Sequence, residues 1–407
     1  MSAATVAVFC MPEDGHLQRL RPLIASLARR GLAAHVFTHD RYVEQVRRAG
    51  AVFHDVFEGR ALEQGEDASL PVPCRYVTFA GQHGEEVTRE VAALRPALVV
   101  HDAFAVIGPL VATALGLPHV NVCAGHAVDA ARYRAALATD PRVRISQSCS
   151  EAVAALRKRQ AIVDASPFSY VSTPSPHLNV YCEPAEYLTD TERCALEPVA
   201  FFGSLPPADE LGERRRGDGT WSFGEDATGL RVYVSLGTVV WRYWPHDALA
   251  TLGAVAEAVA SIPGARAVLS LGHASLGPGE ARLLAQQGVT VATYVDQWAI
   301  LDEADAFVTH HGLSSTHEAI FHRVPMLSYP MFWDQPALAA KCQELGLAIP
   351  LSETPRGVVR PEKVRTALEE LVERVEALRA RLEEAREWEL RTIAGREDVL
   401  DRIVALI

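Results

Sequence analysis

The sequence lacks the motifs that mark several large enzyme classes. It contains no G-x-x-x-x-G-K-[ST] phosphate loop, no G-x-G-x-x-G dinucleotide fingerprint and no G-x-S-x-G nucleophile elbow. The first absence argues against a helicase, although the letters D-E-A-D occur at residues 302–305, where they are typical of a solvated helix face. The other two absences argue against NAD chemistry and serine hydrolysis.

Long apolar runs, paired cysteines and excess positive charge are also missing. No apolar run reaches about 18 residues, and the N-terminal stretch becomes charged at Glu13, so neither a membrane span nor a signal peptide is predicted. The net charge of -12 disfavours binding to nucleic acid or to an anionic membrane. Scattered cysteines without a C-x-x-C pair indicate free thiols in a reducing cytosol, so a cytoplasmic protein is expected. The seven cysteines are Cys10, Cys74, Cys123, Cys149, Cys182, Cys194 and Cys342.

The sequence does contain a repeated alternation of short apolar runs with helical patterns. Its 407 residues suggest two domains or more, at about 150 residues each. Continuous apolar strands between helices predict an α/β fold whose parallel sheets are covered on both faces. Candidate strands lie at residues 5–10, 33–38, 97–104, 119–123, 230–238, 264–272, 289–295, 305–311 and 324–330.

The alternation weakens between residues 191 and 229, where Pro, Gly and charged residues are frequent. We therefore expect a first domain over residues 1–210, a linker over 211–228 and a second domain over 229–385. Residues 386–407 form a final helical segment. The two domains are predicted to be Rossmann-like, doubly wound parallel sheets that face a central cleft. Ligands of such sheets bind at the carboxyl ends of the strands, so the motifs there matter most.

A candidate anion site follows the strand at residues 305–311. A helix is predicted to start directly after Gly312, and its first N–H groups have no partner within the helix. Ser314, Ser315 and Thr316 add hydroxyl donors, and His310 adds an imidazole N–H. This set of donors suits a diphosphate, with Gly312 allowing close approach. The simpler alternative is that Ser314 or Ser315 only caps the helix.

Two further strand ends carry polar or aromatic groups. Asp334 and Gln335 follow the strand at 324–330 and offer hydrogen-bonding groups that suit sugar hydroxyls. Alternatively, Asp334 is only the N-cap of the next helix. Tyr294 and Gln297 end another strand, where a planar base could stack on the aromatic ring, although most such aromatics belong to the core.

The joint order of these motifs is identifiable. S-L-G-T at Ser235–Thr238 is followed by Y-V-x-Q, then by T-H-x-G-x-x-S-T-x-E, then by P-x-x-x-D-Q ending at Gln335. This order resembles the family-one nucleotide-sugar glycosyltransferases, plant and microbial enzymes that decorate natural products. The resemblance is dense in the second half of the chain and thin in the first. It implies the GT-B fold, with an acceptor-binding first domain, a donor-binding second domain and a C-terminal helix that packs back on the first.

The resemblance also implies roles for individual residues, each at the position that matches a family motif. Gly237 and Thr238 lie at the cleft beside the donor. The base and ribose are contacted by Tyr294, Val295, Gln297 and Glu318. The diphosphate is bound by His310 and by backbone N–H groups of Gly312, Leu313, Ser314 and Ser315. The sugar is bound by Trp333, Asp334 and Gln335.

Two departures from the family pattern lie in this half. Tyr294 stands where the family usually has Trp, and His311 stands where a small residue is usual. His311 either adds a second phosphate donor or points into the core, and the sequence leaves these alternatives open.

A candidate base lies near the start of the chain. His16 precedes the first predicted helix, in a stretch that resembles the family's G-H-x-x-P, with Arg19 in place of Pro. A hydroxyl acceptor is a weak nucleophile and needs a base within hydrogen-bond reach, a task that suits a neutral histidine. Asp102 ends a strand at the same sheet edge and matches the carboxylate that orients this histidine in the family. His101 is the less suitable partner, because strand alternation points it away. The alternative for His16 is a surface histidine at a helix start.

Together these features predict an enzyme, a hexosyltransferase of natural-product or antibiotic biosynthesis. We expect inverting transfer of a hexose or deoxyhexose from a UDP- or dTDP-sugar, a co-substrate, to a small-molecule acceptor, in a monomer or homodimer. No D-x-D motif ends a strand of the donor half, so no metal or other cofactor is expected. The linkage type stays open, and acceptor specificity is assigned to loops near residues 68–84 and 125–150.

Two other functions remain possible on the same architecture. One is a nucleotide-sugar 2-epimerase, against which the Asp334–Gln335 pair argues. The other is a non-catalytic partner of another glycosyltransferase, against which His16 and Asp102 argue, because such a partner needs no base.

Overall fold

The structure, a computed structural model, divides the chain into two compact units. It describes residues 3–62, 74–123, 125–127, 129–139, 143–159, 162–163, 165–206, 211, 222–224 and 228–407. The first unit consists of residues 1–204 and 392–407, and the second of residues 205–391. Most of the predicted linker, 211–228, lies outside the described residues.

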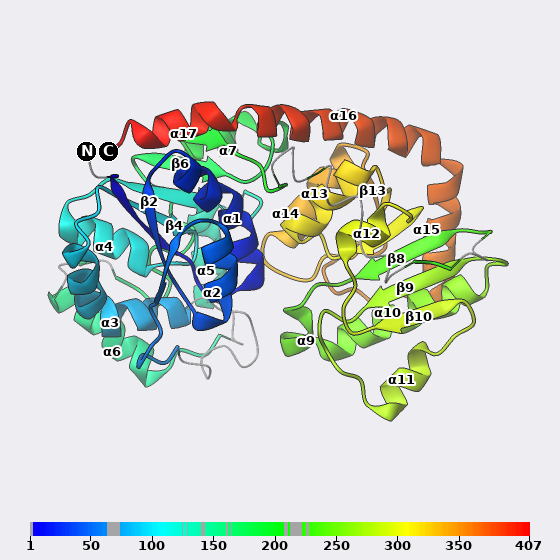
Figure 1. Cartoon of the computed structure of the whole chain (residues 1–407). Coiled ribbons are helices and arrows are strands. Elements are labelled where there is room, and N and C mark those ends of the chain that lie inside the picture. Colours follow the sequence, from blue (N-terminus) through cyan, green and yellow to red (C-terminus); the bar gives the residue numbers. More distant parts are fainter. Residues whose placement is uncertain are drawn as a thin grey trace. The chain divides into compact units, whose positions relative to one another are not determined.

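The first unit is built on a parallel seven-stranded sheet with the order β3-β2-β1-β4-β5-β6-β7. The chain starts in the middle of the sheet and winds outward in both directions, which is the doubly wound arrangement predicted from the apolar runs. Figure 1 shows its helices on both sides of the sheet. The strands are β1 (Thr5–Phe9), β2 (Ala33–Thr38), β3 (Val52–Asp55), β4 (Leu98–Asp102), β5 (His119–Cys123), β6 (Leu178–Tyr181) and β7 (Val199–Phe201).

Two sequence expectations in this unit are corrected by its helices. The first helix begins at Asp14, so His16 lies within its first turn and does not precede it. Residues from Cys74 onward, expected to be a loop, form a helix whose buried face includes Val77, Val87 and Val91 at helical spacing. The helices are α1 (Asp14–Arg29), α2 (Val43–Arg48), α3 (Cys74–Ala93), α4 (Ile107–Leu115), α5 (Ala130–Thr139), α6 (Gln147–Arg159) and α7 (Asp190–Ala195), with 3-10 turns η1 (Asp40–Tyr42) and η2 (Ala185–Tyr187).

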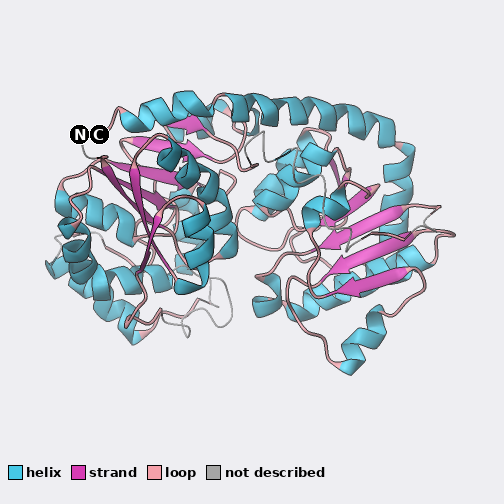
Figure 2. Cartoon of the chain, viewed as in Figure 1, coloured by secondary structure: helices cyan, strands magenta, loops and turns pink. Residues whose placement is uncertain are grey.

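The second unit contains a parallel six-stranded sheet with the order β10-β9-β8-β11-β12-β13 (Figure 2). Two doubly wound parallel sheets thus confirm the predicted α/β class. The strands are β8 (Arg231–Ser235), β9 (Arg266–Ser270), β10 (Val289–Ala292), β11 (Ala306–Thr309), β12 (Met326–Ser328) and β13 (Ala348–Pro350). The helices are α9 (Val240–Tyr243), α10 (Pro245–Ala260), α11 (Pro278–Leu284), α12 (Gln297–Leu301), α13 (Leu313–His322), α14 (Gln335–Glu344), α15 (Pro361–Glu373), α16 (Val375–Ala394) and α17 (Arg396–Val404).

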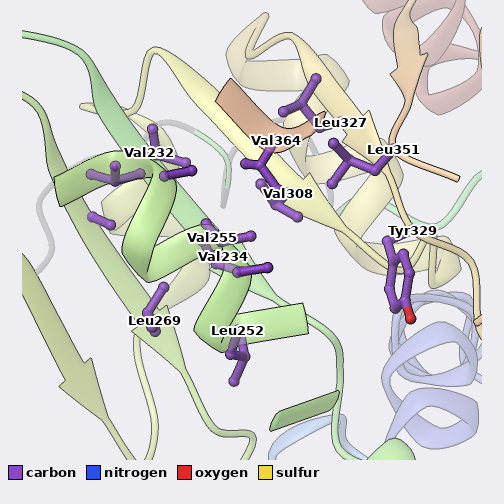
Figure 3. Packing of buried hydrophobic residues seen from close by; sticks show 14 of the residues in the cluster. Val232, Val234, Leu252, Val255, Leu269, Val308, Leu327, Tyr329, Leu351 and Val364 are labelled. Carbon is purple, nitrogen blue, oxygen red and sulfur yellow. The ribbon is translucent and has the colours of Figure 1, made fainter. Parts of the chain in front are cut away.

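Branched aliphatic side chains fill the core of the second unit. Val232 and Val234 of β8 and Val308 of β11 meet Leu252 and Val255 of α10, all of them fully buried (Figure 3). Burying each such side chain contributes about 1.5–3 kcal/mol. Because this core fixes the strands, it also fixes the turns that leave their carboxyl ends.

The last helix, α17, belongs to the first unit. Arg396 stacks over the ring of Phe202 at 4.4 Å and donates through Nε to the Phe202 carbonyl at 2.7 Å. Arg30, the C-cap of α1, forms ion pairs with Glu397 and Asp401. Each of the seven cysteines carries a free thiol, as predicted. Among the described residues, no helix is long and apolar enough to cross a membrane.

Candidate active site

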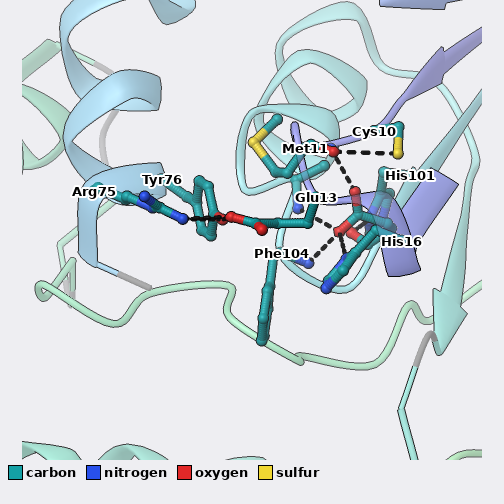
Figure 4. A network of polar contacts seen from close by, with 10 residues as sticks. Cys10, Met11, Glu13, His16, Arg75, Tyr76, His101 and Phe104 are labelled. Carbon is teal, nitrogen blue, oxygen red and sulfur yellow. Dashed lines mark hydrogen bonds and ion pairs between the residues drawn. The ribbon is translucent and has the colours of Figure 1, made fainter. Parts of the chain in front are cut away.

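The structure brings His16 and Asp102 together. His16 lies in α1, which follows β1, and Asp102 ends β4. Strands β1 and β4 are hydrogen-bonded neighbours, with Phe9 opposite His101, so both residues lie at the same edge of the sheet. His16 Nδ1 is 3.0 Å from Asp102 Oδ1 (Figure 4). Both side chains are nearly or fully buried, at 8% and 0% exposure. This geometry suits a base and the carboxylate that orients it.

Backbone N–H groups hold the Asp102 carboxylate in place. Oδ2 accepts from Met11 N at 2.7 Å, and Oδ1 accepts from Phe104 N at 2.7 Å and Ala105 N at 3.1 Å. Burial raises the pKa of this carboxyl, but the charge and hydrogen bond of His16 and the N–H groups of Met11 and Phe104 outweigh it, so the net pKa is lowered. An ionised Asp102 can only accept, so Nδ1 of His16 donates in this hydrogen bond, and in the neutral imidazole Nε2 is then the nitrogen with the lone pair.

His101 points away from this pair, as strand alternation predicted. Its Nδ1 donates to the Asp102 carbonyl at 3.1 Å, and its Nε2 lies 2.9 Å from Nδ1 of His119 on β5. Burial lowers the pKa of His101 to about 4 and that of His119 to about 3. Both rings are therefore neutral parts of the sheet.

A second polar group beside His16 was not found from the sequence. Glu13, which precedes α1, accepts hydrogen bonds from Arg75 and from Tyr76 Oη, the latter at 2.9 Å (Figure 4). The ring of Phe104 lies between this group and the base, 4.9 Å from the His16 ring and 5.9 Å from the Tyr76 ring. Arg75 and Tyr76 fall in the segment expected to set acceptor specificity. They contact Glu13 because they lie in α3, and no local sequence pattern predicts this contact.

In the second unit, β11 ends at Thr309 and α13 begins at Leu313, with Gly312 as the N-cap. The predicted helix start after Gly312 is therefore confirmed. The His310 ring fills the space beside two glycines: a Cβ on Gly312 would lie 2.4 Å from His310 Nε2, and one on Gly237 would lie 2.6 Å from it. A side chain at either glycine position would therefore displace the imidazole of His310. Nδ1 of His310 is a long 3.4 Å from the Ser235 carbonyl.

The structure decides between the two alternatives for His311. Its ring is fully buried, with Nδ1 3.2 Å from Thr316 Oγ1 and Nε2 2.7 Å from Ser328 Oγ. Burial, together with the charges of His310 and His317, lowers its pKa to about 3. His311 is a neutral core residue and not a second phosphate donor.

Gln297, Ser315 and Glu318 form one hydrogen-bonded group. Gln297 Nε2 donates to Glu318 Oε2 at 2.6 Å, and Ser315 Oγ donates to Gln297 Oε1 at 3.3 Å. Three residues predicted to contact the donor are thus neighbours, from α12 and α13. Gln297 orients the Glu318 carboxylate, an acceptor that suits ribose hydroxyls.

The remaining predicted donor residues differ in exposure. Tyr294 is 52% exposed, and its ring stacks on His273 with centroids 4.5 Å apart. Thr238 is also exposed and Ser314 is half-buried, whereas Val295 and Leu313 are buried and can offer only backbone groups to a ligand. The predicted roles of these residues stay predictions.

The segment before α14 gives Gln335 a structural contact that the sequence did not suggest. Gln335 Oε1 accepts from Met331 N at 3.0 Å and from Phe332 N at 3.2 Å, so its carbonyl oxygen is engaged within the protein. Asp334 is the N-cap of α14 but makes no side-chain capping bond, which removes the simple alternative of a capping carboxylate. Trp333 has a left-handed backbone, with φ 54°.

The chain is similar in sequence to known proteins. Residues 201–376, which include the predicted donor residues of the second unit, match the family described as "UDP-glucoronosyl and UDP-glucosyl transferase". NDP-glycosyltransferase YjiC of Bacillus subtilis (strain 168) is 23% identical over 394 residues, which cover 93% of each chain. The chain is a nucleotide-sugar glycosyltransferase of the GT-B fold.

Solved structures show the same fold for this glycosyltransferase. The glycotransferase of kitacinnamycin superposes with a TM-score of 0.75 at 23% identity, over 99% of this chain and 100% of that one. Glycosyltransferase VinC, solved in complex with dTDP, superposes with a TM-score of 0.65 at 19% identity, over 99% of each chain. The GT-B class predicted from the motif order is confirmed.

Proposed function

We propose that this glycosyltransferase moves a hexose or deoxyhexose from a UDP- or dTDP-linked donor to a small natural-product acceptor, with inversion at C1 and without a metal ion. The first unit supplies the base and the second unit binds the activated sugar. The acceptor class and the nucleotide are supported by relatives whose names refer to natural products and by the dTDP bound to VinC.

In the proposed reaction, His16 Nε2 removes the proton of an acceptor hydroxyl as its oxygen attacks C1 of the sugar. The bond between C1 and the phosphate oxygen breaks, and the electron pair leaves with the nucleoside diphosphate. The imidazolium that forms at His16 is stabilised by the ionised Asp102 at 3.0 Å. A single displacement from behind inverts the configuration at C1.

Negative charge develops on the leaving diphosphate, and the start of α13 suits it. The first N–H groups of this helix point out of its N-terminus, with Ser314 and Ser315 in the first turn. Donors aimed at charge that appears only in the transition state lower the barrier most. In the proposal, this helix start and His310 do what a divalent cation does in other enzymes.

The observation that carries the proposal is the buried His16–Asp102 hydrogen bond, with the carboxylate held by three backbone N–H groups. A histidine that merely begins a helix needs no such support. The N–H groups hold Asp102, Asp102 selects the tautomer of His16, and the ring of Phe104 packs against the imidazole with ring centroids 4.9 Å apart.

The His16→Ala variant tests this assignment. Transfer from a nucleotide sugar to small hydroxylated acceptors should fall about 10²–10⁴-fold, the usual contribution of a general base. Calorimetric binding of UDP or dTDP should remain unchanged, because the removed ring belongs to the first unit. His246→Ala, an exposed histidine at the start of α10, serves as the matched control. Wild-type transfer rates in His16→Ala would show that the base is another group.

A further inference from the structure

Residues 330–334, here called the sugar loop, connect β12 to α14 and carry Trp333 and Asp334. The backbone of Trp333 has φ 54°, in the left-handed region that residues with a Cβ rarely adopt. A segment in this conformation keeps its shape only when its surroundings hold it there.

The sugar loop is held on its N–H side by Gln335. As described above, Oε1 of this buried amide accepts from both Met331 N and Phe332 N. One side chain thereby satisfies two consecutive donors and fixes the direction of the peptide planes before Trp333.

The carbonyl side of the loop is held by Arg356, which follows β13. Its Nη1 donates to the Met331 carbonyl, and its backbone N donates to the Pro330 carbonyl at 3.2 Å. Met331 is therefore fixed from both sides, by Gln335 at its N–H and by Arg356 at its C=O. A charged donor makes a hydrogen bond about twice as strong as a neutral one.

Arg356 is itself fixed. Its guanidinium carbon lies 4.5 Å above the ring of Trp244, and that ring lies 5.0 Å from the ring of Phe332 in the sugar loop. Next to it, Tyr329 Oη donates to the Gly357 carbonyl at 3.1 Å. The planar guanidinium thus lies between the aromatic face of Trp244 and the loop backbone, an arrangement that a lysine ammonium does not reproduce.

We propose that Arg356 is a positioning residue for sugar recognition: it locks the sugar loop so that Trp333 and Asp334 meet the sugar of the donor. This inference rests on the proposed function, in which these residues bind the sugar. Arg356 acts through the loop backbone and touches neither the nucleotide contacts at Gln297 and Glu318 nor the reacting atoms. Its removal should therefore separate sugar recognition from nucleotide binding.

Two substitutions and one control test the proposal. Arg356→Ala removes both the hydrogen bond and the stack on Trp244, and Arg356→Lys keeps the charge but not the planar group. Arg360→Ala is the matched control, because that arginine is exposed and its guanidinium forms no hydrogen bond or ion pair with a described residue. For each variant, kcat/KM is measured for the nucleotide sugar, and the Kd of the free nucleoside diphosphate is measured by calorimetry.

We expect Arg356→Ala to lower kcat/KM for the nucleotide sugar at least about tenfold, as the loss of a charge-assisted hydrogen bond predicts. The Kd of the nucleoside diphosphate should stay within about twofold of wild type, since the contacts to the nucleotide are intact. Arg356→Lys should fall between Arg356→Ala and wild type, and Arg360→Ala should match wild type.

Three results would contradict the inference in distinguishable ways. Unchanged kcat/KM in Arg356→Ala overturns the role of Arg356 and leaves the proposed function intact. Equal losses of nucleotide-sugar turnover and nucleoside diphosphate binding show a general structural defect and also overturn it. A wild-type enzyme that turns over no nucleotide sugar refutes the proposed function itself. If Arg356→Ala does not fold, Arg356→Lys provides the same comparison.

Discussion

At the scale of single residues, the proposed donor site depends on glycines whose missing side chains leave room for the ring of His310. Gly312 has φ −63°, which any residue can adopt, so backbone strain does not explain it. The reason is space: a Cβ there would lie 2.4 Å from His310 Nε2, closer than real Cβ atoms come to any neighbour. The glycine of the motif therefore holds the histidine of the same motif in position.

This argument predicts the effect of Gly312→Ala. The added methyl group should displace the His310 ring and raise the Kd of UDP or dTDP about tenfold or more, with the fold intact. Gly279→Ala in α11 is the matched control, because nothing lies within 4 Å of its added Cβ. That control should bind normally and be stabilised by about 0.5–1 kcal/mol. Equal nucleotide affinity in both variants, measured by calorimetry, would show that His310 does not bind the diphosphate.

At the scale of elements, buried neutral histidines lie within or next to strands. His101 on β4 is 3% exposed and His311, after β11, is fully buried, with pKa values lowered to about 4 and about 3 by burial. Each ring serves as a hydrogen-bonding core residue only while it is neutral. The two histidines lie in different units, so both units share this property.

The lowered pKa values predict acid sensitivity. Below about pH 6.5, the approximate pKa of histidine in the unfolded chain, these histidines are protonated in the unfolded state but not in the folded state. The free energy of unfolding therefore falls as the pH decreases from about 6.5 towards about 4. Each such histidine lowers the free energy of unfolding by about 1.4 kcal/mol for every pH unit in that range. Urea unfolding at pH 7.5, 6.5 and 5.5 measures the loss. Asparagine tolerates the left-handed φ of 58° at position 311. The His311→Asn variant should therefore show a smaller change of unfolding free energy with pH in the second unit. An unfolding midpoint that stays constant from pH 7.5 to 5.5 would contradict the buried, neutral state.

The sequence predicted the elements whose signals are local. The apolar runs at β1, β4, β5, β8 and β11 and the helix start after Gly312 all lie where expected. The short strand β3, Val52–Asp55, was missed, because its partly exposed V-F-H-D has neither a continuous apolar run nor a strict alternation. The start of α1 was placed too late, because Asp14 and Gly15 carry no apolar signal.

The sequence predicted the site residues that belong to recognisable motifs, but few of the contacts between residues that are distant in the sequence. The contact between His16 and Asp102 was predicted correctly, because both residues lie where neighbouring strands end at one edge of the sheet. The role of His311 could not be decided, because its burial depends on Ser328 of a neighbouring strand. The Glu13–Arg75 contact and the Arg356 hydrogen bond to Met331 join residues 62 and 25 positions apart, and no spacing rule connects them.

At the scale of the whole molecule, the two units divide the proposed chemistry. The first unit holds the buried His16–Asp102 pair, and the second holds the helix start at Gly312 and the sugar loop. The C-terminal helix α17 returns to the first unit, where Arg396 contacts Phe202. The boundaries of the units fall after Ser204 and after Arg391, so most of α16 counts with the second unit. A single chain thereby carries both the base and the binding site proposed for the activated sugar.

The configuration of the product tests the central claim, a single displacement assisted by His16, most directly. With a nucleotide sugar whose diphosphate is α-linked, the anomeric proton of the purified product is measured by NMR. One displacement from behind gives a β-linked product, and His16→Ala should give the same product far more slowly. An α-linked product would contradict the account, because retention requires two displacements or a different mechanism in which His16 is not the base.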